Sequence, residues 1–464
     1  MNWKSGWSSL MAVSLLLLLS GCKVGPNYAR PNVPVPPSHR ADGTPPDSQT
    51  PPERTFGDLK WFELFQDEML QQFIRAALKE NYDVRIAAQR ILAARAYVTV
   101  EKAPLYPSAG LAASAERQNG GTQAGDTSFA GGSVIWELDL FGRIRRSTEA
   151  ARAEYLALEA VRQGVLQTLV AGVAGSYFQM LELDQELSVA RKFLESRKDS
   201  LRLVQARLAG GLATQMEADQ AASLVIAAES MIVDAQRRHE QTENYLNLLL
   251  GRLPGPIAHT ASLTEQKIIP QVPAGLPSSL LERRPDIRQA EQQLVAANAR
   301  VGVAKSMFFP SLSLTGSVGY QTYQSSNLFQ KNGVVSGYGG SLTAPIFHAG
   351  ALWANYKASK AQREAAVLSY QKSVQEAFRE VADSLIGYQK AMEYRNQRAL
   401  YAATLRSQLR LADMRYRGGV SSYLEVLDTE RQALDAELSF SQAYLAELNS
   451  LVYLYKALGG GWLP

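Results

Sequence analysis

Two copies of one pattern run through the chain, and this duplication limits the possible folds more than any other feature. Residues 207–217 and 415–425 share an Arg, a Gly-Gly pair and a closing Glu at the same positions, and they lie 208 residues apart. Residues 83–85 and 286–288 match at an offset of 203. Solenoid repeats span about 20–50 residues, so a period near 200 indicates a tandem duplication with two interleaved halves.

Each copy contains the same elements in the same order: a helix, a Pro-Ser break, a β-like region, a very long helix, a Gly-Gly turn and another helix. Gly accepts the positive φ that ends a helix, so each Gly-Gly pair predicts the tip of a helical hairpin. The first repeat is expected over 61–252, with strands at about 105–141 and helices at about 66–104, 142–208 and 213–250. The second is expected over 279–464, with strands at about 308–347 and helices at about 280–307, 350–416 and 421–458. A linker at 253–278 joins them.

Composition excludes several classes of protein. The chain has 464 residues and a net charge of +4, too small a charge to indicate nucleic-acid binding. One Cys leaves no intrachain disulfide, and four His offer little material for a metal site. No cofactor is therefore expected.

The N-terminus predicts a secreted, lipid-anchored protein. An apolar run over 10–19 is too short to span a bilayer, which takes about 20 residues, and fits a signal peptide over 1–21. It ends in Leu-Ser-Gly-Cys, which resembles a bacterial lipobox, so Cys22 is expected to be acylated. A Pro-rich stretch within 22–60 then predicts an extended spacer.

The β-like regions alternate between apolar and polar residues. Val134, Trp136 and Leu138 share one face, and Leu312 and Leu314 share a face in the second copy. Such strands are typical of a transmembrane β-barrel, although a soluble hairpin packed on the helices has the same alternation. Four strands in lipid would leave two open edges, so a membrane-spanning sheet requires oligomerisation. A trimer would supply twelve strands, an even number within the observed range. The predicted fold class is thus an α+β membrane protein.

The chain resembles the outer membrane factor family, the TolC-like exit ducts of efflux pumps and type I secretion systems, and most of all its lipoprotein branch (the OprM/NodT type). The resemblance rests on the lipobox, both Gly-Gly tips and three motifs at 282–287, 345–347 and 426–428. It implies a homotrimer in the outer membrane with a 12-stranded barrel and a long α-helical periplasmic tunnel. It also implies passive conduction between a periplasmic adaptor, an inner-membrane RND-type transporter and the exterior.

The resemblance further implies a gate at the periplasmic tip of the second copy. Carried over to this sequence, the closing acids are Glu425 and Asp428, their basic partners are Arg417 and Arg431, and Leu424 narrows the opening. In a trimer, each acid would form a ring of three carboxylates, which binds cations and bridging Arg side chains.

The duplication supports this placement of the gate. At an offset of 208, Arg417 corresponds to Ala209, Asp428 to Gln220 and Arg431 to Ser223. The first copy therefore lacks most of these charges, and we expect its hairpin to be a static wall. By analogy, the adaptor is expected to contact both tips, at Gly210, Gly211, Gly418 and Gly419.

Other functions fit less well. His239-Glu240 begins like a zinc-protease helix, but Glu243 occupies the second ligand position, so no enzyme is expected. A periplasmic adaptor lipoprotein should contain one hairpin, whereas this chain has two. A stand-alone porin would share the strands but not the long helices. The duct of a type I protein secretion system remains an alternative, and the sequence does not identify the cargo, for which drugs are one option.

Overall fold

The computed structural model describes residues 23–37, 40, 56–118, 125–259, 262–266, 279–322 and 333–461. Cys22 and most of the Pro-rich spacer lie outside the described residues. So do most of three further features that the sequence predicts, a turn at 118–121, a loop at 325–333 and a short linker strand near 266–269. Within them, no helix is both long and apolar enough to cross a membrane.

The chain forms two compact units. The strand unit comprises the residues up to Val33, Gln89–Ala160 and Arg288–Ser373. The hairpin unit comprises Pro34–Ala88, Val161–Ile287 and the residues from Val374 onward. Each unit takes segments from both halves of the sequence, so the two copies are interleaved as the duplication predicts.

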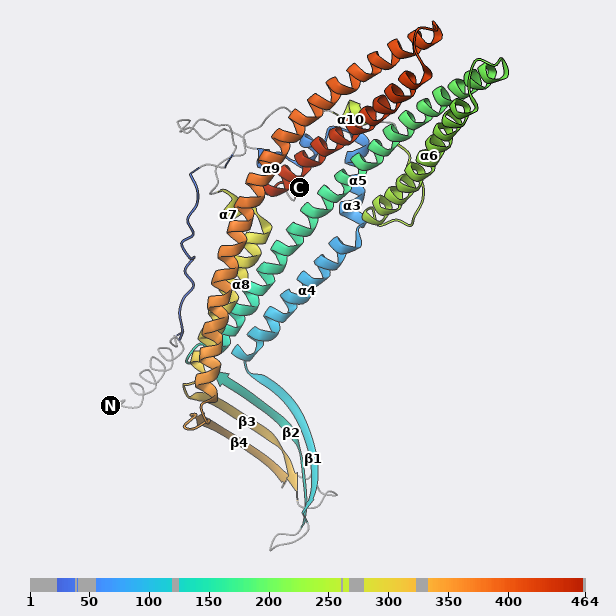
Figure 1. The fold of residues 1–464 in the computed structure, drawn as a ribbon. Helices are drawn as coiled ribbons and strands as arrows, with labels where there is room; N and C mark the ends of the chain where they lie inside the picture. The colour runs from blue at the N-terminus through green and yellow to red at the C-terminus, as the bar shows by residue number, and fades with distance from the viewer. Residues whose placement is uncertain are drawn as a thin grey trace. The chain divides into compact units, whose positions relative to one another are not determined.

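The strand unit contains one antiparallel sheet in the order β1-β2-β3-β4 (Figure 1). β1 (Ser108–Gln118) and β2 (Gly125–Leu138) come from the first copy, and β3 (Ser311–Thr322) and β4 (Val334–Thr343) from the second. Because β2 pairs with β3, neither copy forms its sheet alone. β1 and β4 are the two edges of the sheet within the chain.

The long helices make the duplication visible in the structure. α5 (Arg143–Ala209) and α9 (Ala351–Arg417) each have 67 residues, while α6 (Gln215–Leu249) and α10 (Tyr423–Ala457) each have 35. We call α5, its turn and α6 the first hairpin, and α9, its turn and α10 the second hairpin. Figure 1 shows each pair meeting at its own tip.

The helix expected over about 66–104 is two helices, α3 (Glu68–Glu80) and α4 (Tyr82–Lys102). Asn81 separates them: its Oδ1 accepts hydrogen bonds from the backbone N–H groups of Asp83 and Val84, at 2.8 and 3.2 Å, and so caps α4. Its Nδ2 donates to the carbonyl of Leu249. An Asn that bonds its own backbone favours a break over continued helix, and this overrides the helical pattern.

The second copy has a break at the matching place. Instead of one helix over about 280–307, the structure has α7 (Leu280–Arg283) and α8 (Pro285–Ser306). Pro285 disfavours helical backbone at the preceding Arg284 and is tolerated at the start of α8, where an N–H would lack a helical partner. The described residues also form the short helices η1 (Phe56–Asp58), α2 (Trp61–Leu64), η2 (Ala103–Leu105) and η3 (Leu263–Glu265).

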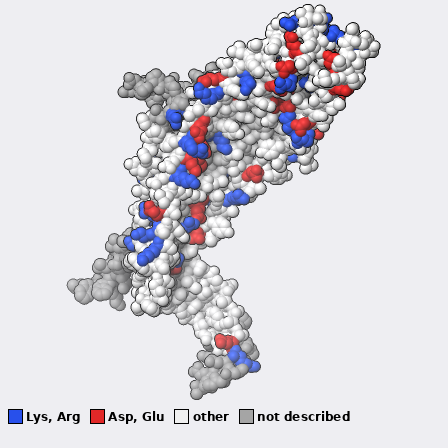
Figure 2. Space-filling view, in the orientation of Figure 1, with Lys and Arg blue, Asp and Glu red and all other residues white. Residues whose placement is uncertain are grey.

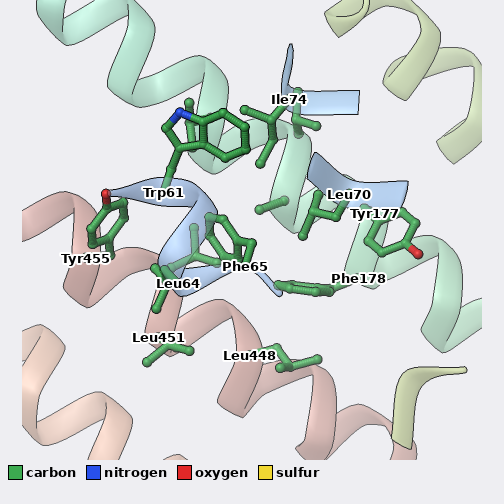
Figure 3. Close-up of a cluster of buried hydrophobic side chains, with 14 of the residues drawn as sticks. Trp61, Leu64, Phe65, Leu70, Ile74, Tyr177, Phe178, Leu448, Leu451 and Tyr455 are labelled. Atoms are coloured by element: carbon green, nitrogen blue, oxygen red, sulfur yellow. The ribbon is translucent and has the colours of Figure 1, made fainter. Parts of the chain in front are cut away.

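The main core of the hairpin unit lies where α2 and α3 pack against α5 and α10 (Figure 3). Trp61, Phe65 and Leu70 meet Tyr177 and Phe178 of α5, and the same cluster includes Leu448, Leu451 and Tyr455 of α10. Burying one large apolar side chain contributes about 1.5–3 kcal/mol. This cluster therefore joins both hairpins at the ends of their helices that are far from the turns, which we call their bases.

Candidate functional site

The sheet has one apolar face. Opposed residues of an antiparallel pair share a face, and here Trp136 opposes Leu314, Leu312 opposes Leu342 and Tyr320 opposes Val334. Several side chains on this face are exposed, among them Val318 at 60%, Tyr338 at 98% and Leu342 at 68%. The faces expected from the alternating sequence are thus aligned across the sheet. Figure 2 shows few charged side chains over the sheet and many over the helices.

The opposite face carries mostly small and polar residues, together with Phe129, Ile135 and Val335. Ser133 opposes Ser317, Ser313 opposes Ser341, and Gly131 opposes Gly319. A Cβ at Gly131 would lie 2.5 Å from the carbonyl oxygen of Val318, so only Gly fits there. A sheet with one apolar face and one mostly small and polar face is what a membrane barrel needs between lipid and an aqueous lumen.

The two hairpin turns have nearly the same backbone. Gly211 and Gly419 take φ values of +76° and +74°, in the left-handed region that favours Gly. The N–H of Leu212 donates to the carbonyl of Arg207 at 2.8 Å, and the N–H of Val420 donates to that of Arg415 at 2.9 Å. These bonds satisfy carbonyl groups at the helix ends, as in a Schellman motif.

The first tip is closed by a capping box. The Thr214 hydroxyl accepts a hydrogen bond from the N–H of Glu217, and the Glu217 carboxylate accepts one from the N–H of Thr214 at 2.7 Å. That backbone hydrogen bond holds the pKa of Glu217 below its ordinary value. Glu217, the charged residue of this capping box, therefore bonds within the turn itself.

The second tip has no such cap, because the Ser422 side chain makes no capping hydrogen bond. Glu425 instead pairs with Arg415 at 3.3 Å, and Arg417 pairs with Asp413 at 2.8 Å. Sequence reasoning missed both partners, although the i,i+4 spacing of Asp413 and Arg417 could have indicated the second pair.

The remaining expected gate residues also lie on the surface of the single chain. Asp428 pairs with Arg431 at 3.2 Å, as the i,i+3 spacing predicts, and Arg431 lies 3.9 Å from Asp435. Leu424 is 67% exposed. Exposed pairs contribute about 0–1 kcal/mol each, so these charges add little to the stability of one chain.

Apolar packing holds the two tips together below their turns. Val204, Ala218 and Ala221 of the first hairpin form one cluster with Ala412, Tyr416, Tyr423 and Val426 of the second. The Arg207 guanidinium lies 4.3 Å from the ring centre of Tyr416, a cation–π contact. The cluster is small and rich in Ala, so it buries less apolar surface than the core at the base.

His239 takes part in an ion-pair cluster at the base of the first hairpin. Asp184 on α5 contacts His239 at 3.2 Å and forms a short hydrogen bond with His259, which follows α6. Burial opposes ionisation, but these two hydrogen bonds lower the pKa of Asp184 to about 2. No group of three or more His, Cys, Asp and Glu among the described residues is arranged to hold a metal ion.

The described N-terminal segment is fixed to the strand unit by Arg146, which is fully buried on α5. Its guanidinium donates to the carbonyls of Val24 and Gly25 at 3.2 and 3.1 Å and to the side chain of Asn27 at 2.9 Å. Further along, Arg30 forms a bidentate pair with Glu291 of α8, with both distances 2.7 Å. No sequence pattern indicated this docking.

Comparison with known proteins gives consistent matches. The family model described as "Outer membrane efflux protein" matches residues 73–252 and 276–460, one stretch in each copy. The solvent efflux pump outer membrane protein SrpC of Pseudomonas putida is 35% identical over 461 residues, covering 96% of this chain and 97% of SrpC. The cation efflux system protein CusC of Escherichia coli is 33% identical, covering 98% of each chain.

Solved structures of outer membrane channels have the same fold as this chain. The crystal structure of the open state of the MtrE outer membrane channel of Neisseria gonorrhoeae superposes with a TM-score of 0.85 at 33% identity. That match covers 95% of this chain and 99% of the MtrE chain.

Proposed function

Because the chain belongs to the outer membrane efflux protein family, we propose that it is the outer-membrane exit duct of a tripartite efflux pump. Three copies form the duct, which extends into the periplasm and works with an adaptor and an inner-membrane RND-type transporter. Members of this family are transport ducts and not enzymes. The single observation that best supports conduction is the sheet with one apolar face and one polar face.

The edges of that sheet explain why three copies are needed. Among the strands that the structure describes, β1 and β4 each have one edge without a partner strand. An unpaired backbone group in lipid costs several kcal/mol, so the β4 edge of one copy must pair with the β1 edge of the next. Closure of three four-stranded sheets gives a 12-stranded barrel, with the apolar face toward lipid and the Gly- and Ser-rich face toward water.

The gate is the second hairpin. Glu425 and Asp428 would form rings of carboxylates around the axis, bridged between copies by Arg417 and Arg431, with Leu424 narrowing the opening. Support comes from the exposure of all five side chains in the single chain, which leaves them available to neighbouring copies. We call these five the gate residues.

Cys22 carries the lipid anchor, because it ends a lipobox. The docking of residues 24–30 by Arg146 and Glu291 supports this role, since a firmly held segment transmits the position of the anchor to the strand unit. Several acyl chains would make the attachment stable, at about 0.8 kcal/mol for each buried CH₂ group.

The adaptor contacts the two turns, at Gly210-Gly211 and Gly418-Gly419. A groove of about 540 Å³ lies beside the second turn and offers a site for an adaptor side chain. Its lining includes Leu411, Met414, Arg415, Val420 and Glu425. Small molecules are the proposed cargo, since the named relatives export solvents and cations.

The test is single-channel conductance of the purified oligomer in a planar bilayer. The wild type should show a small, closed-like conductance that rises in Asp428→Ala, while Gln220→Ala at the equivalent first-copy position should match the wild type. A monomeric mass with no channel from any variant would exclude the duct. A trimeric channel whose conductance is unchanged by Asp428→Ala would exclude the gate alone.

A further inference from the structure

A buried ion pair joins the two hairpins below their tips. Arg197 on α5 and Glu430 on α10 have side chains only 5 and 3% exposed, and their nearest N–O distance is 4.0 Å. Both belong to the hairpin unit. Glu430 directly follows Thr429 and lies five residues, about one turn and a half, after Glu425, so its position on α10 is between the gate residues Asp428 and Arg431.

The hydrogen-bonding groups of this ion pair are only partly satisfied. The Nε of Arg197 and the Oε1 of Glu430 have no hydrogen-bond partner among the described residues. Arg197 instead donates from Nη1 to the carbonyl of Leu224 on α6 at 3.1 Å, which fixes it to the first hairpin. Burying charge without full hydrogen bonding is costly, so such a pair persists only where the surrounding packing holds it.

A second buried pair on α10 provides the contrast. Glu447 is almost fully buried and accepts two hydrogen bonds from Arg395 of α9, at 2.6 and 3.2 Å. This pair is well formed and lies within the second hairpin. The incomplete pair is therefore the one that crosses between hairpins.

The surroundings of Glu430 connect it to the gate. Burial raises the pKa of Glu430, while Arg197 and a hydrogen bond from Ser196 lower it and the Asp413 carboxylate raises it. Asp413 is the partner of Arg417, one of the gate residues. If Arg417 turns toward a neighbouring copy, Asp413 loses its counter-charge, and its repulsion of Glu430 grows.

We infer that Arg197 and Glu430 are positioning residues of the gate, whose strained buried pair holds the second hairpin against the first when the channel is closed and releases it at low cost. When α10 moves away from α5, both charged groups regain water, which offsets the lost attraction. The inference rests on the proposed gate, because it assumes that the second hairpin moves.

Two variants of this pair should differ in their effect on the open probability. Glu430→Gln leaves the Arg197 charge buried without a counter-ion, so the open probability should rise by about tenfold. The double variant Arg197→Met with Glu430→Leu removes both charges and fills the space with apolar groups, which is neutral or stabilising for a buried pair. Its open probability should equal or fall below that of the wild type.

The experiment is single-channel recording of the trimer in planar bilayers, with Glu447→Gln as the matched control. That control disrupts a buried pair on the same helix within one hairpin, so it should leave the open probability unchanged. Equal increases in Glu430→Gln and Glu447→Gln would show a general loss of stability and overturn the inference. An increase in the double variant as large as in Glu430→Gln would also overturn it.

A pH profile separates this role from a purely structural one. Protonation of Glu430 resembles Glu430→Gln, so the wild-type open probability should rise as pH falls, and the Glu430→Gln profile should be flatter. If Asp428→Ala opens the channel but the profiles of wild type and Glu430→Gln coincide, the pair has no gating role and the proposed function stands. If no variant conducts, the proposed function fails and the inference fails with it.

Discussion

At the first hairpin, Glu217 caps the helix that follows the turn, whereas at the second hairpin the equivalent Glu425 pairs with Arg415 of the opposite helix. The backbones of the two turns are almost the same, as the φ values of Gly211 and Gly419 show. The equivalent glutamates therefore have different roles, since Glu217 caps a helix and Glu425 forms an ion pair. The capping box holds the first turn closed, while the second turn keeps its charges on the surface.

The bases of the hairpins differ as well. The first is held by His239, His259 and Asp184, and the second by Arg395 and Glu447. His239 and Glu447 occupy equivalent positions in the two copies. The duplication thus preserved helix lengths and turn geometry and let the polar contacts diverge. We expect this divergence to separate a static hairpin from a mobile one.

The largest expected effect comes from the basic gate residues. Arg417→Ala should raise the open probability about tenfold, because a trimer loses three exposed pairs of about 0.5 kcal/mol each, and a total near 1.4 kcal/mol is a factor of ten. The reverse change, Ala209→Arg, adds the charge to the first hairpin and should leave conductance unchanged. Planar-bilayer recording measures both. A response to Ala209→Arg as large as to Arg417→Ala would remove the distinction between the hairpins.

A smaller effect is expected of pH on the stability of the first hairpin near its base. Hydrogen bonds to Asp184 raise the pKa values of His239 and His259 above their ordinary value of about 6.5. Their stabilisation is therefore complete below about pH 6.5 and is lost as pH rises through the raised values. Burial raises the pKa of Glu182, also on α5, to about 7, so the stability linked to its protonated form is lost as pH rises from its ordinary pKa to about 7.

Hydrogen exchange across the pH range would test this. After correction for the intrinsic exchange rate, protection of the C-terminal half of α6 should fall between pH 6 and pH 9, and that of α10 should change little. His259→Gln should reduce the pH dependence in α6. A parallel decline in both helices would assign the effect to the whole unit and not to the His cluster.

The smallest expected effect concerns the caps. Thr214→Ala removes the hydroxyl that accepts from the N–H of Glu217 but keeps the backbone N–H of residue 214, so protection in the first turn of α6 should fall about fivefold. Ser422→Ala should change the first turn of α10 very little, since the Ser422 side chain makes no capping bond. Local hydrogen exchange compares them directly. Equal losses would mean that the second turn is capped in solution as well.

The features that the sequence predicted depend on local periodicity. The duplication, the alternating strands and the Gly-Gly turns follow from spacing alone, and the structure confirms the shared faces at Trp136 and Leu314. The charges at 417, 425, 428 and 431 were recognised through family resemblance, and their gating role remains a prediction. The repeat boundaries also remain predictions.

What the sequence did not predict depends on packing between distant segments. Arg146 is fully buried because the N-terminal segment folds onto α5, and no local pattern shows such a contact. The pairing of Glu425 with Arg415 depends on how α9 and α10 meet. Asn81 lies within a helical pattern, and besides capping α4 locally its side chain donates to the carbonyl of Leu249, 168 residues away in sequence, a contact that the pattern does not show.

The most direct test of a mobile second hairpin compares equivalent positions at the two turns. Leu212 and Val420 are 82 and 74% exposed and lie 208 residues apart. Spin labels on Leu212→Cys and Val420→Cys, read by pulsed electron paramagnetic resonance in the trimer, report distances between copies. Acylation of the native Cys22 blocks its labelling. A trimer without the added Cys, treated with the same spin label, provides the background.

The account predicts that adding Asp428→Ala lengthens and broadens the distances between copies at Val420→Cys and leaves those at Leu212→Cys unchanged. Equal movement at both positions, or movement only at Leu212→Cys, would contradict the assignment of the second hairpin as the gate.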